Sequence, residues 1–170
     1  MPHTINETHD PNLKSWVESA NDPHTDFPIQ NLPFVHAIRP KERPPTDLLL
    51  GVRIGDQLLD INQLVHDQLI TDRRLIEGAS FGLTAGEINM SMNAEIVHDL
   101  RKRLIELLNT DASADVRSRV SKALHPVPTK PHAGIDDPSP LIVLPIRRIP
   151  NYTDCYASIQ HTTNVGCMFM

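Results

Sequence analysis

The sequence predicts an α+β fold that is mainly β with added helices. Two apolar runs flank the dipeptide Gly55-Asp56, and this arrangement indicates a β-hairpin over residues 48–61. Apolar residues recur at three- and four-residue steps through residues 94–109, a period typical of an amphipathic helix. The chain has 15 prolines and 7 glycines among its 170 residues, so we expect several stiff, extended connections rather than a continuous helical bundle.

The first part of the chain divides into two predicted segments. Residues 1–25 are rich in His, Asn, Asp and Pro and have no apolar period, so we expect a poorly ordered extension. From Asp26 the chain reads DFPIQNLPFVHAI, in which Pro28 and Pro33 interrupt the apolar residues. Proline cannot donate a hydrogen bond to a neighbouring strand, so this stretch suits an irregular edge strand and not the centre of a sheet.

The hairpin and the short helix after it are predicted from local chemistry. Glycine at the first position of a two-residue turn supplies the positive φ that the reversal needs, and Gly55 stands at that position. Asp60 is predicted to cap a short helix that carries its apolar residues on one face. Those apolar residues are Ile61, Leu64, Val65 and Leu69.

Residues 94–109 have the clearest helical pattern, and a helix of this length would span about 24 Å. A second, shorter helix is expected to follow and to end at Pro126. The apolar run LIVLPI at residues 141–146 is predicted to be a strand that leaves one unit and enters another, so we place a domain boundary there. The apolar residues of the second helix are Val116, Val120 and Leu124.

Charge and composition exclude several classes of protein. Sixteen basic residues against 21 acidic ones give a net charge of -5, which argues against a nucleic-acid partner. The chain shows no signal peptide and no run of about 18 apolar residues, so we expect a soluble, cytoplasmic protein without a membrane segment. Short basic clusters are expected to be solvated edges of helices or strands. They lie at Arg73/Arg74, Arg101–Arg103 and Arg147/Arg148.

Cysteine and histidine spacing does not by itself predict a metal site. Cys155 and Cys167 have neither the paired spacing of a zinc site nor the density of a disulfide scaffold, so we expect both to be reduced. Three histidines lack metal-ligand spacing and are expected to be surface or half-buried side chains. They are His66, His98 and His125.

Polar chemistry concentrates in the last twenty residues, NYTDCYASIQHTTNVGCMFM. Both tyrosines of the chain lie there, together with a carboxylate and an imidazole. If the stretch is helical, Asp154 and His161 lie two turns apart on nearly the same face, about 10 Å along the axis, and could flank one ligand. The same spacing also fits a capped, half-exposed helix without a functional role.

The run YTDCYASIQHTTNVGCMF resembles the signature of the fumarylacetoacetase family. Three earlier motifs, DFPIQNLPF, GVRIGDQLLDI and INMSMNA, are also similar to that family and occur in its order. The resemblance covers residues 26–170. It implies an SH3-like small barrel over residues 26–145, followed by the truncated start of a β-rich catalytic domain at residues 146–170.

The resemblance also implies an activity. Family members hydrolyse the carbon-carbon bond of 4-fumarylacetoacetate to fumarate and acetoacetate in tyrosine and phenylalanine catabolism, using Ca²⁺ or Mg²⁺, and are homodimers. Carried over residue by residue, Asp154 would be a metal ligand and His161 the general base. Tyr156 and Met170 would contact the small diketo acid substrate. The other metal ligands would follow residue 170.

Departures from the family pattern leave two alternatives open. Met170 stands where the family has a substrate-binding arginine, which favours a related acylpyruvate or diketone hydrolase. Cys155 replaces an aromatic residue, and Pro150-Asn151 replaces Gly-Asp. The other alternative is a non-catalytic module that binds a partner through residues 141–146 and the signature segment, since a strand without its sheet leaves an open edge.

Overall fold

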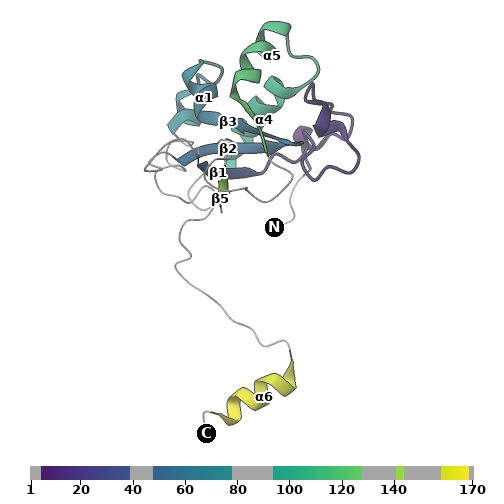
Figure 1. Cartoon of the computed structure of the whole chain (residues 1–170), viewed down its shortest axis with the longest axis vertical. Coiled ribbons are helices and arrows are strands. Elements are labelled where there is room, and N and C mark those ends of the chain that lie inside the picture. Colours follow the sequence, from purple (N-terminus) through teal and green to yellow (C-terminus); the bar gives the residue numbers. More distant parts are fainter. Residues whose placement is uncertain (1–4, 39–47, 78–93, 128–140, 144–157, 169–170) are drawn as a thin grey trace.

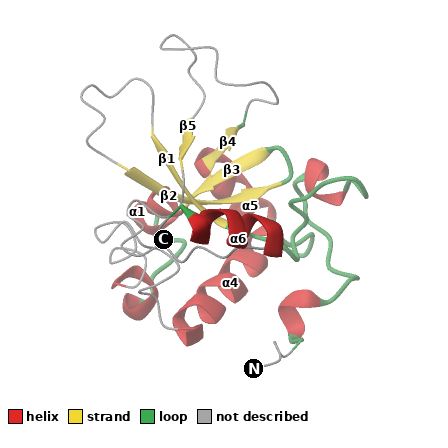
Figure 2. Ribbon diagram, turned by 90° about the horizontal axis from the view of Figure 1, so that it is seen from below, coloured by secondary structure: helices red, strands yellow, loops and turns green. Residues whose placement is uncertain are grey.

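A computed structural model describes residues 5–38, 48–77, 94–127, 141–143 and 158–168 (Figure 1). Five antiparallel strands form one sheet, in the order β4-β3-β2-β1-β5, which curls into a half-barrel. Helices accompany the sheet, so the predicted α+β class is confirmed (Figure 2). The strands are β1 (Phe34–Ile38), β2 (Leu48–Ile54), β3 (Gln57–Asp60), β4 (Leu124–Pro126) and β5 (Leu141–Val143).

The predicted hairpin is confirmed by β2 and β3. The two strands pair in antiparallel register up to Ile54 and Gln57, which leaves Gly55-Asp56 as the turn. Gly55 has a φ of 52°, in the left-handed region that glycine adopts at little cost. The hairpin is therefore closed by the residue that the turn geometry requires.

The prediction of an irregular edge strand in residues 26–38 is wrong. β1 pairs with β2 on one side and with β5 on the other, so it lies inside the sheet. The reason is position along the chain: Pro28 and Pro33 both precede Phe34. All five residues of β1 keep the backbone N–H groups that a central strand needs.

The strand at residues 141–143 belongs to the sheet of the first unit. Its three residues pair antiparallel with His36, Ala37 and Ile38 of β1. Residues 144–146 of the predicted strand lie outside the described residues. The half-barrel thus includes a segment more than a hundred positions from its β1 partner, a pairing that local patterns do not reveal.

The long predicted helix is confirmed, and the two shorter ones end earlier than predicted, with Leu69 lying beyond the end of the first. α1 (Ile61–His66) begins after Asp60, whose carboxylate accepts from the backbone N–H of Gln63 at 3.0 Å. α4 (Ala94–Leu108) is the long amphipathic helix. α5 (Ala114–Val120) ends earlier than expected, because a 3₁₀ turn, η3 (Ser121–Ala123), leads Leu124 into β4. Leu124 pairs there with Leu59.

No helix in the described ranges combines the length and apolarity needed to cross a bilayer.

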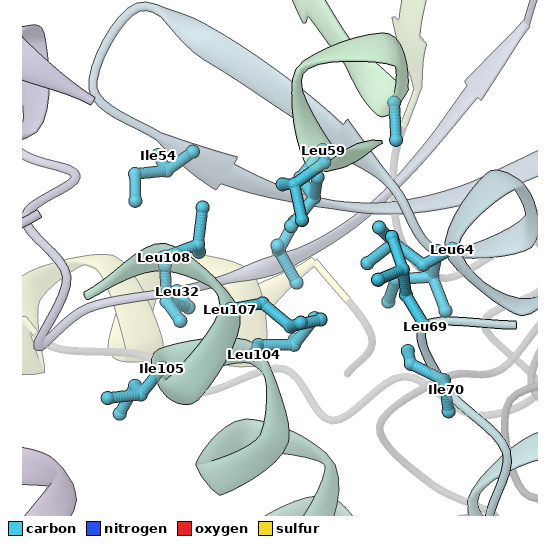
Figure 3. Close-up of a cluster of buried hydrophobic side chains, with 14 of the residues drawn as sticks. Leu32, Ile54, Leu59, Leu64, Leu69, Ile70, Leu104, Ile105, Leu107 and Leu108 are labelled. Atoms are coloured by element: carbon cyan, nitrogen blue, oxygen red, sulfur yellow. The ribbon is translucent and has the colours of Figure 1, made fainter. Parts of the chain in front are cut away.

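The main core lies between one face of the sheet and helices α1, α4 and α5 (Figure 3). Alternate residues of β2 enter it, as the two-residue period of a strand demands. Ala37, Leu49 and Leu58 form a smaller buried cluster on the opposite face. Fully buried contributions to the main core come from Leu50, Val52, Ile54, Leu59, Leu64, Leu100, Leu104 and Leu108.

The expectation that residues 1–25 form a poorly ordered extension is wrong for residues 5–25. This stretch contains two 3₁₀ turns, η1 (Glu7–His9) and η2 (Glu18–Asn21), and Val17 and Ala20 are buried in the main core. The order comes from contacts that no local pattern shows: Trp16 donates to carbonyls at the end of α4. Residues 1–4 lie outside the described residues.

The hairpin turn is fastened to η2 through Asp56. The Ser19 hydroxyl donates to one carboxylate oxygen of Asp56 and accepts from its backbone N–H at 3.1 Å. The Gln57 amide donates to the same carboxylate at 3.0 Å. The Ser19 hydrogen bond, followed by the Gln57 one, lowers the pKa of Asp56.

We expect the substitution Asp56→Asn to lower the free energy of unfolding by about 0.5–1 kcal/mol near pH 7, because two donors lose a charged acceptor at a largely solvated site. A carboxylate with a lowered pKa contributes stability above its unfolded pKa of about 4 and loses it as the pH falls through the folded value. The difference from wild type should therefore shrink at about pH 3. Urea unfolding, followed by the fluorescence of the single tryptophan Trp16, measures the free energy of unfolding of both proteins at each pH.

The exposed acid Asp111 offers a matched control for this charge change. Asp111→Asn should leave the pH dependence of unfolding close to wild type. An equal loss for both variants would show that net charge, and not the Ser19 contact, is responsible.

Candidate functional site

The predicted site residues fall mostly outside the described part of the chain. Asp154 and Tyr156 lie within residues 144–157, and Met170 lies within residues 169–170. His161 is described and belongs to α6 (Ile159–Cys167). The geometry of the candidate site therefore begins with this helix.

A serine cap starts α6. Ser158 has an extended backbone, with φ -116° and ψ 127°, and its hydroxyl accepts from the His161 backbone N–H at 3.4 Å. Thr162 and Thr163 turn their hydroxyls back onto the helix and donate to the carbonyls of Ser158 and Ile159, at 3.0 and 2.8 Å. The cap and these internal bonds explain how a segment rich in β-branched residues is helical.

The helix boundary bears on the spacing of Asp154 and His161, which the sequence predicts only for the case that one helix contains both. Asp154 and His161 would share a helical face only if one helix contained both, but α6 begins at Ile159 after the extended Ser158. The two-turn spacing along an axis therefore does not apply. His161 lies in the first turn of α6, with its backbone N–H tied to the cap.

α6 is open to solvent. Its described residues are exposed apart from the half-buried Val165, and Ile159 and Met168 are 77% and 73% exposed. The helix lies apart from the sheet (Figure 1). His161 thus presents an accessible imidazole, and an enclosed site around it requires groups from other parts of a protein.

The described residues contain no cluster of three or more His, Cys, Asp or Glu side chains that could hold a metal ion. The prediction of surface or half-buried histidines is confirmed: the side chains of His66, His98 and His125 are 81%, 34% and 33% exposed. Cys167 is a free, exposed thiol, as expected, and Cys155 lies outside the described residues.

A charged groove of about 400 Å³ lies between α4 and residues 70–75. Its charges are paired within the fold: Arg74 contacts Asp72 at 3.2 Å and Asp99 at 3.3 Å. Arg103 contacts Glu106 at 2.8 Å and donates twice to the Leu69 carbonyl. The groove holds none of the predicted site residues, so we do not assign it to the active site.

Arg101 differs from the prediction that the cluster Arg101–Arg103 is a solvated edge. The Arg101 side chain is half-buried, and its guanidinium donates to the Thr8 hydroxyl at 3.2 Å and to the Gln30 carbonyl. Burial lowers the pKa of Arg101. The Arg101 side chain therefore has a structural role. The sequence around Arg101 contains no signal that distinguishes it from the exposed Arg73.

Residues 30–130 match a protein family described as Fumarylacetoacetase N-terminal. Curated proteins named fumarylacetoacetase are similar to most of the chain. The protein from Dictyostelium discoideum is 34% identical over 159 residues, which is 92% of this chain and 33% of the relative. The proteins from Rattus norvegicus and Homo sapiens are each 34% identical over 157 residues, covering 91% of this chain and 33% of the relative. The chain spans about a third of the length of these relatives. It belongs to the fumarylacetoacetase N-terminal family.

Proposed function

We propose that this chain supplies the amino-terminal domain and the first catalytic segment of a cytoplasmic fumarylacetoacetase. The reaction is hydrolysis of 4-fumarylacetoacetate to fumarate and acetoacetate in tyrosine and phenylalanine catabolism. The observation that supports this most is the family match over residues 30–130, with similarity to fumarylacetoacetases reaching over 92% of the chain. We expect the complete enzyme to be a homodimer.

The proposed roles rest on four side chains near the end of the chain. The carboxylate of Asp154 is the hard oxygen donor that Ca²⁺ and Mg²⁺ prefer, so it fits as one ligand of either ion, but such ions take about six oxygens or more. When bound, the ion acts as a Lewis acid towards substrate oxygens. Tyr156 and the residue at position 170, Met170, contact the substrate.

His161 is proposed as the general base that takes a proton from the attacking water. Its imidazole fits the role, because imidazole titrates near neutral pH and can hold a proton transiently. The serine cap holds the backbone at this position while the side chain stays accessible. The remaining ligands and the residues that orient His161 are expected in the two thirds of the relatives' length that this chain does not span.

An ultraviolet assay of fumarylacetoacetate loss tests the proposal. The 170-residue chain is compared, with added calcium or magnesium, with a version extended by the rest of a relative's length. We expect turnover from the extended protein only, and its loss on chelation. Absence of turnover from a folded, metal-loaded extended protein would overturn the substrate assignment. Faster turnover of simple acylpyruvates than of fumarylacetoacetate would instead favour a related diketone hydrolase, as the missing arginine at Met170 suggests.

A second candidate is a non-catalytic module that docks onto a partner through α6 and β5. The exposure of Ile159 and Met168 on α6, and of Leu141 on β5 at 40%, favours it. The partner would be a chain that carries the two thirds of the relatives' length that this chain does not span. Mixing the two chains and measuring association by analytical ultracentrifugation separates the cases: binding without metal-dependent turnover would support the module and contradict the enzyme.

A further inference from the structure

Residues 5–21 follow α4 from His98 and Lys102 to its carboxyl terminus, and we call this segment the strap. Its two ends are attached by different kinds of contact. We call residues 6–9 the ionic end and residues 15–20 the anchor end. Both lie outside residues 30–130, the part of the chain that matches the family.

The anchor end closes the carboxyl terminus of α4. The backbone N–H of Trp16 donates to the Leu108 carbonyl at 3.1 Å, and its indole N–H donates to the Leu107 carbonyl at 2.9 Å. The buried Ser15 hydroxyl also donates to the Leu108 carbonyl, at 2.8 Å. The last carbonyls of a helix have no partner within it, so these bonds satisfy groups that would otherwise need water. Val17 buries its side chain beside them.

The ionic end depends on exposed charges. Glu7 contacts the Lys102 ammonium at 3.0 Å and the imidazole of His98 at 3.6 Å. The Glu7 and Lys102 side chains are 60% and 45% exposed, so dissolved salt screens their attraction. The Asn6 amide lies 3.4 Å from the other ring nitrogen of His98. Little apolar surface holds this end, since among its residues only Thr8 is buried. A further contact with α4 is the hydrogen bond that Arg101 donates to the Thr8 hydroxyl at 3.2 Å, so release of this end must also break that bond.

Gln30 separates the two ends. Its side-chain amide donates to the carbonyls of Asp10 and Leu13, at 2.9 and 3.0 Å. These neutral bonds hold the middle of the strap without ion pairs. Loosening at residues 6–9 therefore need not spread to Trp16.

We propose that residues 5–21 form a conformational latch on α4, in which salt releases the ionic end while the anchor end stays bound. The structure supports this through the contrast between the exposed Glu7–Lys102 ion pair at residues 6–9 and the buried backbone capping at residues 15–17. Release would uncover Lys102 and part of α4 without unfolding the domain.

Hydrogen exchange and fluorescence measured on the same sample test the latch. Between about 0.01 M and about 1 M salt the Debye length falls from about 30 Å to about 3 Å. Amide exchange in residues 6–10 should rise about two- to fivefold over this range, as expected for loss of exposed ion pairs. The emission of Trp16, the single tryptophan, should not move. Trp16 reports the anchor end because its indole touches α4 directly.

Two variants sharpen the test. Glu7→Gln keeps the shape of the side chain and removes its charge, so exchange in residues 6–10 should already be fast at low salt and should lose its salt response. Glu18→Gln, at an exposed acid of the same strap, should exchange as wild type does. Salt-independent exchange at residues 6–10 in wild type, or a Trp16 shift that accompanies the faster exchange, would overturn the proposal.

Discussion

Turnover of fumarylacetoacetate should fall by about 10²–10⁴-fold when His161 is replaced by alanine in the extended enzyme, the range expected for loss of a general base. Most of the loss should appear in kcat, because a base acts on the attacking water and not on ground-state binding. The stability of the protein should change little. His161 is exposed, and the contact that caps α6 uses its backbone N–H, which alanine retains.

His66→Ala provides the comparison for this variant. His66 is the exposed last residue of α1 and lies outside the candidate site. The His66→Ala enzyme should keep the kcat and KM of wild type. Steady-state kinetics measures kcat and KM for both variants, and circular dichroism checks that they fold. A folded His161→Ala enzyme with wild-type kcat would remove His161 from the mechanism.

Replacing Gly55 with valine should lower the free energy of unfolding by about 2–6 kcal/mol, combining backbone strain with overpacking. The φ of 52° at this position is unfavourable for a β-branched residue. A Cβ at Gly55 would also lie 2.6 Å from the Ala20 backbone nitrogen, closer than real contacts allow. Because the obstacle is the backbone of η2, a side-chain rotation cannot relieve it.

Urea unfolding followed by Trp16 fluorescence measures this loss and also reports whether residues 15–20 detach. Gly166→Ala is the matched glycine substitution: nothing lies within 4 Å of a Cβ there, and the residue is inside α6. Its free energy of unfolding should equal or slightly exceed that of wild type. An equal loss at both positions would mean that Gly55 has no special role in the turn.

Elements that depend on neighbouring residues could be predicted from the sequence. The Gly55 turn, the Asp60 cap and the apolar period of α4 each result from interactions within a few positions, and each is confirmed. Contacts between segments far apart in the sequence could not be predicted. The burial of β1 depends on β5, and the order of residues 5–21 depends on carbonyls of α4 about ninety positions later.

For the candidate site, the residue types and the family could be predicted from the sequence. The position at which α6 begins came from the structure. The cap at Ser158 follows a recognisable local rule, and it places Asp154 before the start of α6. The roles of Asp154, Tyr156, Met170 and His161 stay predictions. These roles depend on contacts between this segment and residues that are distant from it in the sequence. A local sequence pattern does not predict such contacts.

The capping of α4 by Ser15 and Trp16 also bears on how the protein is made. The donors and the Leu107 and Leu108 carbonyls are separated by 91 to 93 positions. During synthesis Trp16 therefore leaves the ribosome several seconds before the end of α4, at about 5–20 residues per second. Closing so long a loop costs entropy before any contact compensates for it, so attachment of the amino terminus should be a late folding event that follows formation of the β2–β3 hairpin.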